Sequence, residues 1–189
     1  MLISVNLSPH QVHDPDFASD VLDILADAGL APDQLVLEMT ETAMFSDIDA
    51  TIGKLQELRG HGVRIAVDDF GTGYSSLRWL RQFPVDVLKL AREFVVDDAA
   101  GKGDWAFAHA IVMLGRTLQL EIIAEGIETP RQLERLSALG CDYGQGYLFG
   151  RATIAADLPS LIDRIEARQT DTGPAPRASD VLGDASVPA

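Results

Sequence analysis

Two adjacent carboxylates end an apolar run in the segment VRIAVDDFGTGY, which covers residues 63–74. Asp68 and Asp69 would repel each other in a folded chain unless a cation or a proton lay between them. Carboxylate oxygens are hard ligands, which suit Mg²⁺ or Mn²⁺ far better than Zn²⁺. The pair therefore predicts a site for divalent metal.

Polar residues also mark the ends of the other apolar runs. We predict six strands, at residues 2–8, 35–41, 63–69, 86–91, 121–126 and 142–149. Each carries an ionisable or amide residue close to its C-terminal end: Asn6, Glu38, Asp68, Lys89, Glu125 and Gln145. A single acid at a strand end is usually a helix cap or a solvated loop residue. Six polar residues at the ends of six consecutive strands indicate one shared site.

The neighbours of these polar residues are apolar, for example Leu37 and Met39 beside Glu38. Because side chains alternate along a strand, one face of each strand should lie under helices and the other should converge on a polar centre. Helical patterns separate the strands, at residues 75–82, 104–119, 129–139 and 155–168 and in two earlier segments. The first of these earlier helices should have Pro15 at its first helical position and end at Gly29, and the second should be capped by Ser46 and end at residues 60–62.

Alternating strands and helices predict parallel strands joined by crossover helices. Residues from several strand ends that meet at one pole are typical of the active face of a (β/α) barrel, so we expect a TIM-like barrel. A doubly wound open sheet is the alternative, because its ligands also bind beyond the carboxyl ends of the strands.

Composition limits the function further. The chain has 189 residues, 47% of them apolar, which predicts one domain. Its net charge of −14 argues against DNA binding and means that an anionic ligand would need bound cations. A single cysteine, Cys141, excludes a disulfide framework and fits a cytoplasmic protein, and we find no membrane segment. The four histidines lack ligand spacing and should be surface residues.

Six motifs, in order and spacing, resemble those of the EAL-domain family of bacterial cyclic-di-GMP phosphodiesterases: VNLS, LEMTET, VDDFGTGYSSL, DVLKLAREFV, AEGIET and GCDYGQGYLFGRA. The similarity runs from about residue 2 to residue 158. It implies a TIM-like barrel that uses two Mg²⁺ or Mn²⁺ ions to hydrolyse one phosphodiester of cyclic-di-GMP, giving linear pGpG. It also implies that Asn6, Glu38 and Asp68 bind the first metal ion and that Asp69 bridges to, or holds, the second.

The resemblance assigns roles to further residues. It implies that Lys89 orients the attacking water or stabilises charge and that Glu125 is an acid/base or a water-positioning group. Gln145 would support the site, and Glu41 and Glu128 correspond to structural acids of the family. Glu41 would anchor the GTGYSS loop, so that a homodimer through residues 70–76 is expected.

The sequence departs from the family pattern at two points. The Glu-Ala-Leu strand, whose glutamate is another ligand of the first metal ion, lies upstream of the asparagine motif, and only five residues precede Asn6 here. Ala91 stands where the family has an aspartate that should contact the second metal ion. Residues i and i+2 share a face of a strand, so Ala91 should point into the same site as Lys89.

We therefore expect an incomplete barrel, with about six of the expected strands in residues 1–168 and a disordered tail at residues 169–189. Missing strands would have to come from an upstream segment or another chain. Three hypotheses for function stay open: a phosphodiesterase, a catalytically inactive module that binds cyclic-di-GMP or a protein, and a remnant with neither activity. A sensory or cyclase domain upstream would fit the family.

Overall fold

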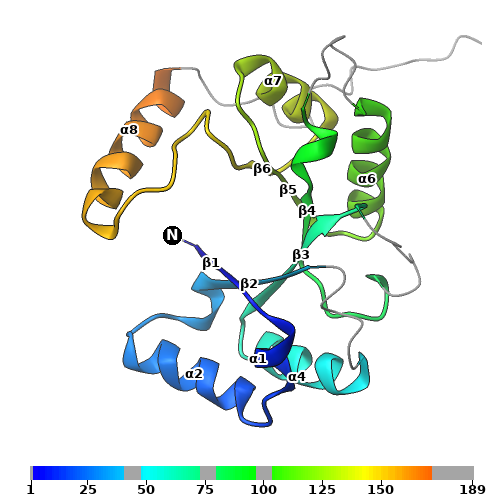
Figure 1. The fold of residues 1–189 in the computed structure, drawn as a ribbon, viewed down its shortest axis with the longest axis vertical. Helices are drawn as coiled ribbons and strands as arrows, with labels where there is room; N and C mark the ends of the chain where they lie inside the picture. The colour runs from blue at the N-terminus through cyan, green and yellow to red at the C-terminus, as the bar shows by residue number, and fades with distance from the viewer. Residues whose placement is uncertain (1, 41–47, 73–79, 97–103, 172–189) are drawn as a thin grey trace, which may run out of the picture.

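The computed structural model describes residues 2–40, 48–72, 80–96 and 104–171. Within these ranges, six strands form one parallel sheet whose spatial order follows the chain order (Figure 1). The strands are β1 (Ile3–Asn6), β2 (Leu35–Thr40), β3 (Arg64–Phe70), β4 (Val87–Leu90), β5 (Glu121–Ala124) and β6 (Tyr143–Gly144). In a doubly wound sheet the strand order reverses at one point, so the sequential order excludes that alternative. The sheet is an incomplete TIM-like α/β barrel, which confirms the predicted fold class.

The described helices lie between the strands along the chain or after the last one. They are α1 (Pro9–His13), α2 (Phe17–Asp27), α4 (Ile48–Gly60), α6 (Trp105–Thr117), α7 (Pro130–Leu139) and α8 (Leu158–Asp171). The described residues also form three short 3₁₀ turns, η1 (Pro32–Gln34), η2 (Arg92–Phe94) and η3 (Ala155–Asp157). No helix in the described part of the chain is long and apolar enough to cross a bilayer.

The start of the first helical region differs from the prediction. Pro15 lies in the turn between α1 and α2 and does not open a helix. Instead, Ser8 caps α1: its side chain accepts a hydrogen bond from the Gln11 backbone amide at 3.4 Å, and Gln11 Oε1 accepts one from the Ser8 amide at 3.0 Å. This reciprocal pair is a capping box, with proline at the next position.

Other boundaries differ at the C-terminal end of the chain. Strand β6 is shorter than predicted because the backbone turns at Gly146, whose φ is 158°. A Cβ at Gly146 would lie 2.2 Å from the carbonyl oxygen of Ile127, so a side chain has no room there. Helix α8 extends to Asp171, three residues into the expected tail. Ser46, most of residues 75–82 and the rest of the tail lie outside the described residues.

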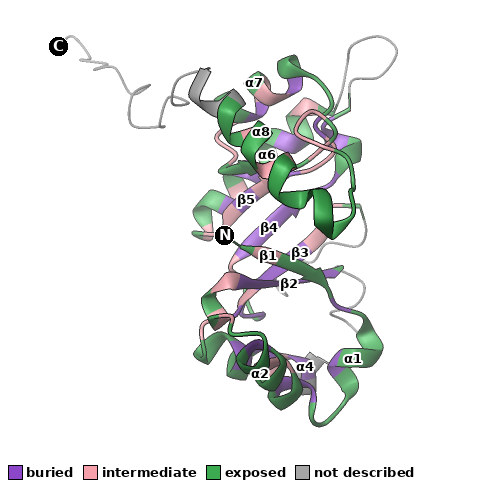
Figure 2. Cartoon of the chain, turned by 90° about the vertical axis from the view of Figure 1, so that its left-hand side faces the viewer, coloured by how far each residue is buried: buried purple, intermediate pink, exposed green. Residues whose placement is uncertain are grey.

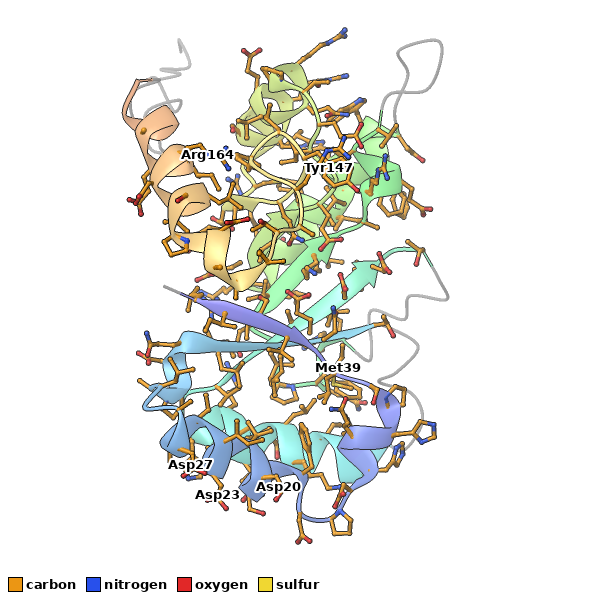
Figure 3. All side chains as sticks on the ribbon, turned by 60° about the vertical axis from the view of Figure 1, so that its left-hand side comes forward. Asp20, Asp23, Asp27, Met39, Tyr147 and Arg164 are labelled. Carbon is orange, nitrogen blue, oxygen red and sulfur yellow. The ribbon has the colours of Figure 1, made fainter. Side chains whose placement is uncertain are left out.

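The two faces of the sheet bury different sets of residues, as the alternation predicts. The face toward the helices holds the main core, in which Met39, Ile65 and Leu88 are fully buried. Figure 3 places Met39 on the helix side of β2. The opposite face holds a small cluster with one residue from each of β2 to β5: Val36, Ala66, Val87 and Ile123. Figure 2 shows that buried residues concentrate on the strands.

Surface features fit the composition. Asp20, Asp23 and Asp27 are exposed along α2 (Figure 3) and contribute to the negative charge of the chain. All four histidines, His10, His13, His61 and His109, are exposed, as predicted. The two outer strands expose apolar surface, since Val5 on β1 is 47% exposed and Tyr143 on β6 is 51% exposed.

Candidate metal centre

Lys89, on β4, lies at the centre of a cluster of carboxylates from β2, β3 and the end of β5. Its Nζ is 2.5 Å from Glu38 Oε2, 3.0 Å from Asp68 Oδ1 and 2.5 Å from Glu125 Oε1. The Lys89 side chain is only 3% exposed and that of Glu38 is 8% exposed. The structure therefore brings together four of the six polar residues that end the predicted strands.

Burial and the Lys89–carboxylate contacts have opposite effects on the pKa values of these groups. Burial acts to lower the pKa of Lys89, but its hydrogen bonds to Glu125, Glu38 and Asp68 outweigh burial and raise that pKa above its usual range. Burial raises the pKa of Glu125, although Lys89 opposes this effect. Three acids thus share one lysine, and the cluster has less positive than negative charge when all its acids are ionised.

The adjacent acids Asp68 and Asp69 both reach this centre because β3 contains a bulge. Val67 pairs with Leu88, but Phe70 pairs with Leu90, so that β3 has one residue more than β4 over this stretch. Asp69 has a φ of 52°, a left-handed conformation that aspartate adopts more readily than most residues. We expected the strand to end at these acids; instead it continues to Phe70 through the bulge.

Oxygen atoms of Asp68, Asp69 and Glu125 all lie within 4.8 Å of one another. These three carboxylates, with Glu38 beside them, form the hard oxygen donor set that Mg²⁺ and Mn²⁺ prefer. The donor set of the chain therefore fits the divalent metal that the sequence predicts.

Three other predicted site residues, Asn6, Gln145 and Glu128, lie in the described part of the chain outside this cluster. Asn6 is exposed at the end of β1 and pairs in register with Glu38. Gln145 is exposed, and its backbone amide donates to Ala124 O at 2.8 Å, which joins the end of β6 to that of β5. Glu128 forms an ion pair with Arg92 at 2.7 Å. Glu41 and residues 73–76 of the expected dimer loop lie outside the described residues.

Ala91 directly follows the last residue of β4 and is 2% exposed. It belongs to the main cluster of buried apolar residues, which also contains Leu90 and Phe94, whereas alternation along β4 predicts that it shares a face with Lys89. A carboxylate at position 91 would therefore lie in a buried place, where ionisation needs a cation nearby.

Sequence reasoning missed two residues that hold the loop after β5. Gln132 is 6% exposed, and its side chain joins that loop to Val95. The sequence feature that could have identified Gln132 is the capping box of α7, in which Thr129 is followed three residues later by Gln132. Arg92 contacts the same loop through Glu128, and no local pattern predicted that contact.

Cys141 is a third titratable group with a perturbed pKa. Burial, aided by the charge of Asp142, raises the pKa of its thiol to about 12, although Arg116 opposes the shift. Because the thiolate is the reactive form, we expect Cys141 to react with a thiol-specific disulfide reagent at pH 8 about 1,000-fold more slowly than an unfolded cysteine. Reaction rates with and without denaturant test this, and equal rates would contradict it.

Comparison with known proteins places this arrangement in a family. The model of the EAL domain matches residues 1–152. The chain is 41% identical over 172 residues to the cyclic di-GMP phosphodiesterase NbdA of Pseudomonas aeruginosa, a match that covers 91% of this chain and 22% of NbdA. It is 45% identical over 156 residues to the bifunctional diguanylate cyclase/cyclic di-GMP phosphodiesterase MucR of the same organism, covering 82% of this chain and 23% of MucR.

Solved structures agree with the sequence comparison. The MucR phosphodiesterase in complex with c-di-GMP is 44% identical with a TM-score of 0.77, and the match covers 83% of this chain and 70% of that one. The EAL domain of Mycobacterium smegmatis DcpA is 35% identical with a TM-score of 0.80, covering 87% and 74%. A manganese and cyclic-di-GMP complex of Klebsiella pneumoniae BlrP1 is 36% identical with a TM-score of 0.72, covering 79% and 38%. The chain spans about a fifth of the length of NbdA and MucR. Because the model of the EAL domain matches residues 1–152, the chain belongs to the EAL domain family.

Proposed function

We propose that this chain is a cyclic-di-GMP phosphodiesterase domain that hydrolyses cyclic-di-GMP to linear pGpG at the Lys89 cluster. The observation that carries the proposal is the convergence of Glu38, Asp68 and Glu125 on Lys89 Nζ, within 2.5 to 3.0 Å, at the carboxyl ends of the strands. The names of the relatives support the choice of substrate.

In this proposal Asn6, Glu38, Asp68 and Asp69 hold Mg²⁺ or Mn²⁺, and Glu125, which has an oxygen within 4.8 Å of oxygens of Asp68 and Asp69, is placed to contribute a further ligand. A bound divalent ion would supply a nucleophilic water and would neutralise charge on the phosphate. Such neutralisation matters here because the chain, with a net charge of −14, would otherwise repel an anionic dinucleotide.

The residues of the chain have separate tasks. The Lys89 ammonium holds Glu38, Asp68 and Glu125 close together and offers a positive charge to the reacting phosphate. Glu125 Oε1 is held by Lys89 Nζ, where it could accept a hydrogen bond from water. Gln145 links the ends of β5 and β6 and so supports Glu125.

A second candidate function is favoured by Ala91. If the carboxylate absent at this position is needed for the second metal ion, the chain is a catalytically inactive module that binds cyclic-di-GMP or a protein partner. Ala91 is 2% exposed, and its methyl group offers no oxygen atom to a metal ion.

We also propose the wider setting of the protein. A cyclase or sensory domain would precede the EAL domain, as the bifunctional name of MucR and the 23% share of its length suggest. The protein would act in the cytoplasm and would form a homodimer through residues 70–76.

The test of the proposed function is an assay of the purified protein with cyclic-di-GMP and Mn²⁺, with pGpG measured by chromatography and binding by calorimetry. Release of pGpG that stops with EDTA is the expected result. Binding without release would favour the inactive module. Neither binding nor release would contradict both the phosphodiesterase and the cyclic-di-GMP-binding form of the inactive module.

A further inference from the structure

We infer that Arg92 is a positioning residue that fixes Glu125 at the metal centre. Arg92 begins η2, three residues after Lys89 in the chain. Its side chain crosses to the segment that follows β5, residues 125–129, where its Nη2 lies 2.7 Å from Glu128 Oε1. The Arg92 and Glu128 side chains are 60% and 40% exposed, so the pair lies at the surface, away from the buried Lys89.

The aliphatic part of Arg92 lies directly over Gly126, the residue after Glu125. Gly126 has a φ of 69°, and a Cβ built there would lie 2.2 Å from Arg92 Cγ and 2.7 Å from Arg92 Cβ. The backbone can approach the Arg92 stem this closely only because residue 126 is glycine. The stem therefore limits how far the backbone next to Glu125 can move outward.

A second connection holds the same two segments together. Gln132 Oε1 accepts hydrogen bonds from the amides of Glu128 and Thr129, at 2.8 and 2.9 Å, while Gln132 Nε2 donates to Val95 O at 3.4 Å. The segment 125–129 is thus joined to residues 92–95 at two points. The Glu125 amide also donates to Leu90 O at 3.1 Å, which fixes the start of the segment.

These contacts matter because the Glu125 carboxylate must meet both Lys89 Nζ, at 2.5 Å, and the oxygens of Asp68 and Asp69. An exposed ion pair alone contributes little to stability. Its effect here is on geometry, because partners behind a metal-binding residue hold it in place and change metal affinity. The expected effect of Arg92 on metal binding rests on the proposed function, whereas its effect on the position of residues 125–129 does not.

The experiment compares Arg92→Ala with Arg92→Lys and with a matched control, Arg59→Ala. Arg59 is 51% exposed and forms a similar ion pair, with Asp86 at 2.8 Å, but it lies at the amino ends of β3 and β4, opposite the metal centre. Two quantities are measured for each protein: Mn²⁺ affinity by electron paramagnetic resonance, and amide hydrogen exchange of residues 125–129 without metal.

We expect Arg92→Ala to weaken Mn²⁺ binding about tenfold and to speed hydrogen exchange in residues 125–129. Arg92→Lys should lie closer to the wild type, because it keeps the stem and the charge, and Arg59→Ala should change neither quantity. Wild-type Mn²⁺ affinity in Arg92→Ala would overturn the inference. If the wild type does not bind Mn²⁺, the proposed function fails, and hydrogen exchange alone decides the role of Arg92: unchanged exchange in Arg92→Ala overturns it.

Discussion

Replacing Lys89 by methionine is expected to destabilise the metal-free protein by about 3–5 kcal/mol, the usual cost of removing one partner from a buried charge cluster. Methionine keeps most of the length of the side chain but leaves Glu38, Asp68 and Glu125 without the ammonium that they share within 2.5 to 3.0 Å. Denaturant unfolding in EDTA measures the loss. The proposed phosphodiesterase activity should also be lost in this variant.

Divalent metal should partly reverse this loss. Three carboxylates without the lysine bind a cation more strongly, and a ligand that binds only the folded state stabilises it. We therefore expect Mn²⁺ to raise the unfolding midpoint more in Lys89→Met than in the wild type. Lys54→Met is the control, because Lys54 Nζ donates to backbone carbonyls of Val12 and Asp14, at 2.6 and 2.7 Å, outside the centre. Equal effects of Mn²⁺ on both variants would contradict the proposed metal centre.

Replacing Ala91 by aspartate should increase the release of pGpG by about tenfold or more, if a carboxylate at this position supplies a ligand for a second metal ion. The same variant should be less stable than the wild type in EDTA, because Ala91 is 2% exposed and a buried carboxylate is costly without a cation. Mn²⁺ should remove much of that difference in stability.

Ala91→Asn is the matched control for this prediction, because asparagine has the shape of aspartate without its charge. Chromatography of pGpG and the number of Mn²⁺ ions bound per chain separate the two variants. An aspartate variant that is no more active than the asparagine variant, and that binds no more Mn²⁺, would show that position 91 does not face the metal centre.

Much of the fold could be predicted because its signals are local. Apolar residues on both sides of Glu38 and of Lys89 indicated the two faces of the strands, and the alternation of strands with helices predicted a parallel sheet. The capping box of α1 was also present in the sequence, in Ser8 and Gln11, but Pro15 gave a competing helix-start signal that the structure does not use. The turn at Gly146, which shortens β6, depends on the backbone of Ile127 and has no local signal.

The sequence by itself determined which residue types stand at the strand ends, and thereby the hard oxygen donors of the candidate metal centre and the similarity to the EAL family. Only the tertiary structure decided how these residues meet. The bulge that brings Asp69 to Asp68 and Glu125 arises from the pairing of β3 with β4. The sharing of Lys89 among three acids and the contact of Arg92 with Gly126 join residues from different strands and loops. Such contacts depend on register and packing between segments distant in sequence, which no periodicity within one segment can specify.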